Sequence, residues 1–167
     1  TEQAFYFIED IANAEIGEPE YQEKYGVQTV EIPIFTAHSS PNSTDPIMEY
    51  EPIVVGTDSM DTNDWRRTYN FAWTVQCFHT LGLFQYVAIF IRNYAQVFYK
   101  DFYEALIFYA KSNPDTLIGQ EFQNVNKILD GVLRGRGFDQ YFLEFSDISW
   151  PMEEASLIRF SQNGDHL

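Results

Sequence analysis

Few residues of this sequence have types and spacings that support chemistry. The three histidines, His38, His79 and His166, lie far apart, and none has a metal-ligating neighbour at helical spacing in a recognised pattern. The single cysteine, Cys77, precedes His79 by two residues, which places their side chains about 160° apart on a helix. A cysteine–histidine nucleophile pair is therefore not expected. His79 lies in an apolar stretch, which favours a hydrogen-bonded core histidine over a ligand or a base.

The segment His38-Ser39-Ser40 is a second group of polar side chains. It follows a predicted strand and lies in a stretch rich in turn-forming residues, 36–46. Binding residues are often found on such loops, so this segment is a candidate for contact with a ligand or a neighbouring domain. The alternative is a loop whose serine and asparagine side chains bond locally.

Arginine side chains flank the uncharged stretch in the middle of the chain, at Arg66, Arg67 and Arg92. An arginine beside aromatic surface can hold a carboxylate or a phosphate. It can equally balance one of the 25 acidic residues. Adjacent Glu153 and Glu154 diverge by about 100° on a helix and therefore do not face one site. No convergent set of acid, base and nucleophile is visible, so catalysis by this chain alone is not expected.

Composition limits the class of protein. The 167 residues suit one domain, and with 45% hydrophobic and 17% aromatic residues they supply ample core. The net charge of −15 excludes general nucleic-acid binding, which needs clustered positive charge. One cysteine excludes an internal disulfide or a cysteine-only cluster, and it fits a reducing cytosol, so a cytoplasmic location is expected. The start at Thr1, with no signal-like segment, is typical of a processed or excised piece.

The elements that would position these residues follow from periodicity and turn signals. Residues 1–25 are predicted to be helical with a break at Gly17 and Pro19, and a short helix over 19–25 ends at Gly26. Strands are predicted over 27–35 and 49–57, pairing antiparallel around the 36–46 loop. Residues 1–31 carry eight acids and one base, which favours a solvated face, with a docking surface for a basic partner as the alternative.

The rest of the chain is predicted to be helical. Asp61 is expected to cap a helix that stops at Gly82, and the next helix, 83–94, is apolar on nearly all faces and is expected to be central. Helices over 98–111 and 118–134 follow, then a short extended piece over 141–145 and a last helix opened by Pro151. The fold class is mainly α, with a small two-stranded β element. Residues 1–60 form a lobe and 61–167 a helical core within one domain, 1–167.

The stretch from Thr68 to Ile91 lacks charged residues over 24 positions, which is long enough to span a membrane. However, it contains several polar side chains and Gly82, which are costly in hydrocarbon. No membrane span is therefore expected. A buried helix pair broken near Gly82 is the preferred interpretation.

Several stretches together resemble the C-terminal region of large cobalamin-binding radical SAM proteins, many of them named after the anaerobic magnesium-protoporphyrin ester cyclase. The resemblance covers nearly the whole chain. The stretches that carry it are Glu20-Tyr-Gln-Glu-Lys-Tyr-Gly26, Ile34-Phe-Thr-Ala-His-Ser-Ser-Pro41, Asp64-Trp-Arg-Arg67, Phe71-Ala-Trp-Thr-Val-Gln-Cys-Phe-His-Thr-Leu-Gly-Leu83, Tyr99-Lys-Asp-Phe-Tyr103 and Trp150-Pro-Met-Glu-Glu-Ala155.

The resemblance implies a parent enzyme, methyltransferase-like or cyclase-like, that holds cobalamin, S-adenosylmethionine and a [4Fe–4S] cluster. One cysteine cannot carry that cluster, so no cofactor, metal or catalytic residue is assigned to this chain. The chain would be an accessory domain, non-catalytic alone, whose partners are the radical SAM barrel and cobalamin domain of the same protein and an unknown small-molecule substrate. On this interpretation the substrate-facing candidates are His38, Ser39, Trp65, Arg66 and Arg67.

A free-standing acidic binding module, using the 1–31 face or an aromatic groove, is the alternative. The two interpretations differ in the surface they predict. An accessory domain leaves one apolar face exposed where the barrel would dock. A free-standing module has a uniformly polar surface with one distinct pocket.

Overall fold

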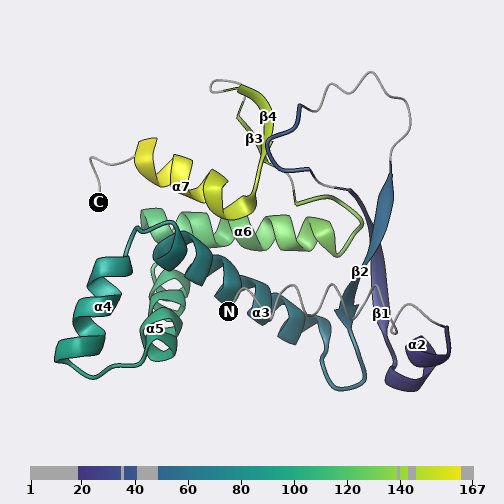
Figure 1. The fold of residues 1–167 in the computed structure, drawn as a ribbon, viewed down its shortest axis with the longest axis horizontal. Coiled ribbons are helices and arrows are strands. Elements are labelled where there is room, and N and C mark those ends of the chain that lie inside the picture. The colour runs from purple at the N-terminus through teal and green to yellow at the C-terminus, as the bar shows by residue number, and fades with distance from the viewer. Residues whose placement is uncertain (1–18, 35, 41–48, 139, 143–145, 163–167) are drawn as a thin grey trace.

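The computed structural model describes residues 19–34, 36–40, 49–138, 140–142 and 146–162. Helix α6 (Leu117–Val132) runs through the middle of the molecule, and α3 (Thr62–Val75) and α7 (Met152–Gln162) both contact it (Figure 1). Their apolar side chains form the core, with Val125, Leu129 and Val132 fully buried on α6. The predicted fold class, mainly α with a small β element, is confirmed.

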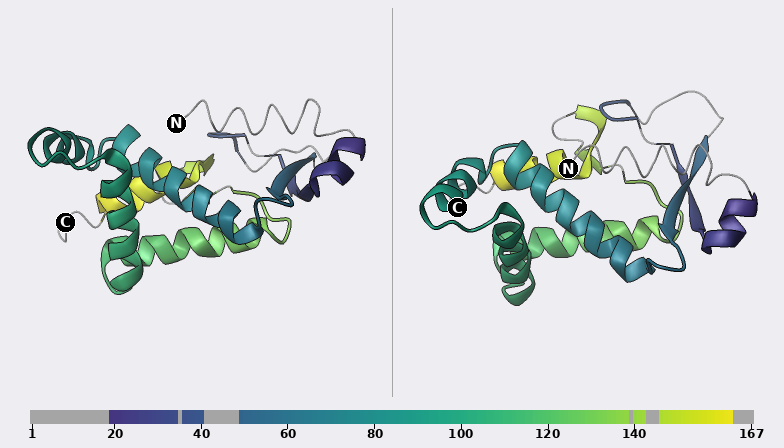
Figure 2. Two further views of the ribbon diagram at one scale, coloured as in Figure 1. Left: turned by 90° about the horizontal axis from the view of Figure 1, so that it is seen from below. Right: turned by 60° about the horizontal axis from the view of Figure 1, so that its bottom comes forward.

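A small β lobe precedes the helices. Helix α2 (Pro19–Tyr25) ends at Gly26, which has φ +58° as the predicted helix end requires. Strands β1 (Gln28–Pro33) and β2 (Tyr50–Gly56) pair antiparallel, with Ile32 opposite Glu51, which confirms the predicted strand pair. Ile32 and Val55 join the helical core, and the lobe lies at the opposite end of the molecule from α4 (Figures 1 and 2).

Helix α3 begins as its sequence predicts. The Asp61 carboxylate accepts from the backbone N–H groups of Asn63 and Asp64, both at 2.8 Å, which satisfies two free donors of the first turn. At its other end the helix continues into a π-helical turn, η1 (Gln76–Thr80), where the N–H of Leu81 bonds to the carbonyl of Gln76. The chain then leaves the helix axis at Gly82, which has φ +93°.

The expectation that the next helix is central is wrong. Helix α4 (Gln85–Tyr94) buries only Ala88 among its side chains, while Tyr86, Phe90 and Tyr94 are 81%, 58% and 78% exposed. The reason is the bend after η1, which turns α4 by 93° from the line of α3 and η1. The helix therefore contacts η1 and α5 at the edge of the molecule (Figure 1) instead of crossing the core.

Within the described residues, no single helix is long and apolar enough to cross a membrane. Taken together, the described helical stretches 62–80 and 85–94 have the length and composition of a span, but they are bent by 93°. The break near Gly82 agrees with the prediction. The predicted burial of the second helix, 85–94, is wrong, because most of its apolar side chains are exposed.

Helix α5 (Tyr99–Ser112) returns beside α3 and turns tightly into α6. Thr116 caps α6 by accepting from the N–H of Gly119 at 3.2 Å. Gly119 lies so close to the preceding turn that a Cβ there would come within 2.0 Å of the Asn113 carbonyl oxygen. The approach of the two helices therefore depends on a residue without a side chain.

A second hairpin, β3 (Gln140–Phe142) and β4 (Ser146–Trp150), was predicted only as a short extended piece. It bonds to the 36–40 segment, which precedes it by more than 100 residues. The N–H of His38 bonds to the carbonyl of Ser149, and the N–H of Ser149 bonds to the carbonyl of Ser39, both at 2.8 Å. The helix predicted before Pro19, most of the acidic 1–31 segment, loop residues 41–46, extended residues 143–145 and His166 lie outside the described residues.

Candidate functional site

A pocket of about 440 Å³ opens between the end of α3, the π-helical turn η1 and the start of α5. One wall is formed by Phe71 and Val75 of α3 and His79 of η1, which are spaced four residues apart. Residues spaced in this way lie on one helix face. The opposite wall is the first turn and a half of α5, contributed by Tyr99, Lys100, Tyr103 and Glu104.

His79 is held in this pocket by a phenol. Its Nδ1 lies 2.7 Å from the Tyr103 hydroxyl, and the Tyr99 ring packs edge-on at 5.3 Å between ring centroids. Burial, followed by the proximity of Tyr99, raises the pKa of Tyr103 to about 12, so its hydroxyl stays protonated at neutral pH. The imidazole and the phenol are thus a positioned polar pair in a mainly apolar pocket, as is typical of small-molecule sites.

His79 lies within the π-helical turn η1. A turn with bonds from residue i to i+5 widens the helix locally, and such turns often occur at functional sites. The prediction that His79 is hydrogen-bonded inside the fold agrees with the Tyr103 contact, although His79 is half-buried and lines a cavity.

A second cavity of about 340 Å³ adjoins the first one along the same pair of helices. Its walls share Phe71 and Glu104 with the first cavity. The remaining lining residues are Arg67, Thr68, Asn70, Ile107 and Lys111.

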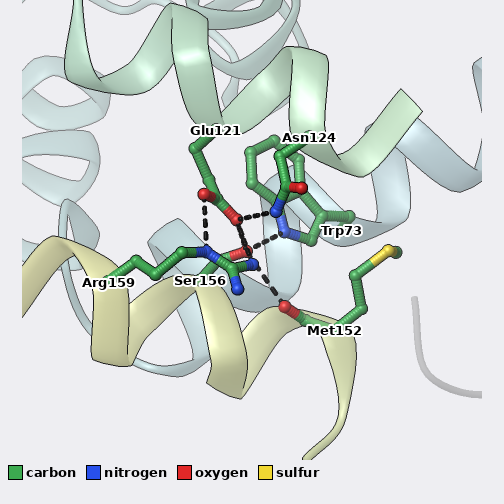
Figure 3. Close-up of polar contacts among 6 residues, drawn as sticks. All are labelled: Trp73, Glu121, Asn124, Met152, Ser156 and Arg159. Atoms are coloured by element: carbon green, nitrogen blue, oxygen red, sulfur yellow. Dashed lines mark hydrogen bonds and ion pairs between the residues drawn. The ribbon is translucent and has the colours of Figure 1, made fainter. Parts of the chain in front are cut away.

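A buried polar network joins side chains of α3, α6 and α7 (Figure 3). The carboxylate of Glu121 on α6, 5% exposed, accepts from Arg159 Nε at 2.7 Å and Nη2 at 2.5 Å, and from Ser156 Oγ at 2.6 Å. The Trp73 indole N–H donates to the same serine hydroxyl at 3.0 Å. Because these contacts join α3, α6 and α7 and fill the carboxylate's acceptor sites, we interpret the network as structural.

Cys77 does not act as a nucleophile in this fold. Its side chain is fully buried, and burial, with a smaller contribution from Glu121, raises the pKa of the thiol to about 12. The thiolate is the reactive form, so little of it exists at neutral pH.

The predicted residues His38 and Ser39 lie together against the β3–β4 hairpin. His38 Nε2 is 2.7 Å from the Glu154 carboxylate, and its ring packs edge-on against Trp150. Ser39 Oγ donates to the Thr36 carbonyl at 2.6 Å. The local bonding considered as an alternative is thus present at Ser39. The Trp150 indole N–H nearby is buried and has no hydrogen-bond partner in the part of the chain that the structure describes.

The other three predicted residues are distributed over α3 and do not join His38. Trp65 is 4% exposed and packs against Tyr69 in the core. Arg66 Nη1 lies 2.5 Å from the Asp130 carboxylate on α6. Arg67 lines the second cavity described above.

No group of three or more His, Cys, Asp and Glu side chains within the described residues could hold a metal ion. Together with the single buried cysteine, this means that the residues present do not fit an iron–sulfur cluster.

Comparison with known proteins identifies relatives by sequence. The chain is 31% identical over 114 residues to the cobalamin-dependent radical SAM methyltransferase TokK of Streptomyces tokunonensis, a match covering 68% of this chain and 16% of that protein. It is 28% identical over 118 residues to the 2-(S-pantetheinyl)-carbapenam-3-carboxylate methyltransferase of Streptantibioticus cattleyicolor, covering 71% of this chain and 17% of that protein.

The chain is similar to methyltransferases. It spans about one sixth of the length of the curated relatives it matches, since the matches cover 16% and 17% of them. No family model matches the chain. The predicted resemblance to cobalamin-dependent radical SAM proteins is thereby supported over about 70% of the chain, while its position within such a protein stays a prediction.

Sequence reasoning missed the pocket around His79 because its two walls come from separate helices. Tyr99 and Tyr103 are four residues apart and therefore share a helix face, which is the signal that could have marked one wall. The π-helical turn that contains His79 has no comparable signal in the sequence.

Proposed function

We propose that this chain is an accessory domain, non-catalytic by itself, of a cobalamin-dependent radical SAM methyltransferase, and that it corresponds to the C-terminal region of that enzyme. The similarity to TokK and to the carbapenam-carboxylate methyltransferase supports the enzyme class. Cobalamin, S-adenosylmethionine and the [4Fe–4S] cluster would be held by the rest of the enzyme, because the residues of this chain do not fit the cluster.

The observation that favours an accessory domain over a free-standing module is an exposed aromatic surface. We call it the α4–α5 aromatic face, and it consists of Tyr86, Phe90, Tyr94, Phe98 and Phe108, which are 58% to 81% exposed. Two of these exposed rings, Phe90 and Tyr94, stack with 4.4 Å between their centroids, and exposed apolar side chains that lie together usually mark an interaction site. A uniformly polar surface, expected for a free-standing module, is not what these helices present.

The occupant we propose for this face is the remainder of the same enzyme. The relatives are about six times longer than the segment they share with this chain, so they contain ample further protein to cover it. Aromatic side chains are enriched at such interfaces because they bury large areas with few rotatable bonds.

Hydroxyl-radical footprinting tests this assignment, because it reports the solvent exposure of individual aromatic side chains. We expect Phe90, Tyr94 and Phe108 to be oxidised in the isolated chain and protected in the full-length enzyme. Tyr50, 57% exposed on β2 at the other end of the fold, is the internal control and should react equally in both. Equal oxidation of the three aromatic residues in both forms would overturn the docking proposal.

The coding DNA upstream of Thr1 provides a test of the enzyme class. An in-frame CxxxCxxC motif supports a radical SAM parent. A start codon directly before Thr1 removes radical chemistry from the chain, and a free-standing acidic binding module becomes the better interpretation.

Substrate contact by His38, Ser39, Trp65, Arg66 and Arg67 remains part of this proposal. The buried Trp150 N–H beside His38 supports a ligand contact there, since a buried donor without a partner is costly. In the complete enzyme we expect His38→Ala and Arg66→Ala to lower turnover of its substrate. If both variants turn over substrate like the parent, the substrate-facing assignment is wrong.

A further inference from the structure

The two cavities between α3 and α5 form one elongated groove. They share Phe71 and Glu104, so one continues into the other along the two helices. We call this the α3–α5 groove. His79 lines the cavity at one end, and Arg67 and Lys111 line the cavity at the other.

The end around His79 suits an apolar or aromatic group. Its lining is dominated by the rings of Phe71, Tyr99 and Tyr103 and the side chain of Val75. The Tyr103 hydroxyl already forms a hydrogen bond with His79 Nδ1 at 2.7 Å. An apolar ligand would therefore not leave this hydroxyl without a hydrogen-bond partner.

The charge of the groove is opposite to that of the chain. Three of the ten Lys and Arg residues line it, namely Arg67, Lys100 and Lys111, against one acid, Glu104. Lys100 Nζ lies 3.7 Å from the Glu104 carboxylate, whereas the acid that Arg67 contacts, Asp64, lines neither cavity. In a chain with net charge −15, this concentration of cations on two facing helices is a local exception.

Both cations can reach a ligand. The Arg67 side chain is 80% exposed, and its Nη1 lies 3.4 Å from the Asp64 carboxylate. An exposed ion pair of this kind contributes little free energy, so it holds Arg67 only weakly. The Lys111 ammonium lies over the Phe122 ring at 5.5 Å from its centroid, and Lys111 is an exposed residue. A carboxylate between these two groups would gain charge-assisted hydrogen bonds.

We propose that the α3–α5 groove binds a small organic carboxylate with an apolar or aromatic body, the body lying near His79 and Tyr103 and the carboxylate near Arg67 and Lys111. The groove shares Arg67 with the substrate-facing residues proposed above, but it does not depend on the accessory-domain assignment. Its failure leaves the accessory-domain assignment intact, and the reverse also holds.

Calorimetric titration of the intact protein with 4-phenylbutyrate, at low ionic strength, tests the proposal. Its neutral analogue, 4-phenylbutyramide, has nearly the same shape and serves as the matched ligand. We expect one site per chain and an affinity for the carboxylate about tenfold higher than for the amide, the size expected of one charge-assisted contact.

The double variant R67A/K111A should bind both ligands with the affinity that the parent protein has for the amide. Lys127→Ala, which removes an exposed charge from α6 outside the groove, should leave both affinities unchanged. Phe71→Ser, at the shared middle of the groove, should weaken both ligands. Equal affinity of the parent for the two ligands, unchanged carboxylate binding by the double variant, or absence of binding would each overturn the proposal.

Discussion

Glu121 shows what a single buried charge contributes to this fold. Its carboxylate accepts from the Arg159 guanidinium and the Ser156 hydroxyl, and the same hydroxyl accepts from Trp73, so three helices meet at one acid. A buried ion pair of this kind adds little to stability compared with apolar packing. Removing one member is costly, because the other charge then stays in a poorly solvated place.

We therefore expect Glu121→Gln to lower the free energy of unfolding by about 2–4 kcal/mol, since Arg159 loses its charged partner while the packing volume is kept. Urea unfolding followed by circular dichroism measures this change. Glu104→Gln is the control, because its pair with Lys100 is exposed and should contribute about 0–0.5 kcal/mol. Equal losses in the two variants would contradict the structural role of the buried network.

The candidate site was only partly predictable from individual residues. An arginine beside aromatic surface can hold a carboxylate, which makes Arg67 a candidate, and it does line a cavity. Trp65 and Arg66 were selected by their place at the start of the same helix. However, successive residues on a helix diverge by about 100°. Trp65 therefore faces the core, Arg66 faces α6 and Arg67 faces α5.

At the scale of elements, local signals predicted the ends of helices well. Asp61 and Gly26 act as expected, because capping and left-handed turns depend on neighbours a few residues away. The placement of α4 was not predictable in this way. The apolar composition of α4 favours burial. The 93° bend before the helix nevertheless directs it away from the core, so its large side chains are exposed.

The two helical glycines of α6 provide a test at this scale. We expect Gly119→Ala to destabilise the protein by about 1–3 kcal/mol, because the new Cβ meets backbone atoms of Asn113 and Pro114, which cannot move without opening the α5–α6 turn. Gly131→Ala is the matched control. The atoms nearest to its Cβ belong to the flexible Arg136 side chain, the first at 3.3 Å. The gain in helix propensity, about 1 kcal/mol, should therefore leave the Gly131→Ala protein as stable as the parent or slightly more stable.

Thermal unfolding of both variants measures the difference. A Gly119→Ala protein as stable as Gly131→Ala would mean that the turn between α5 and α6 adjusts freely, contrary to the close approach described above.

The whole molecule carries a net charge of −15, and this affects its stability as well as its partners. Mutual repulsion of acids destabilises a compact state, and salt screens that repulsion. We expect an increase from about 0.02 M to about 0.3 M NaCl to raise the melting temperature by about 2–4 °C, the shift that corresponds to roughly 1 kcal/mol for a chain of this size. Differential scanning fluorimetry measures it.

The control is pH. Near the sequence pI of about 4.3 the net charge vanishes, so the same salt increase should have little effect there. An equal rise in melting temperature at both pH values would assign the effect to general salting-out and not to screening.

The bonds from His38 and Ser39 to Ser149 also constrain the order in which this protein can be made. They join positions that are 111 and 110 residues apart, so closing that loop is entropically expensive until the helices between them have packed. A ribosome synthesises the 36–40 segment long before β4 exists, and this segment has no strand partner there until nearly the whole chain has been translated. Docking of this loop onto the C-terminal hairpin should therefore be among the last steps of folding.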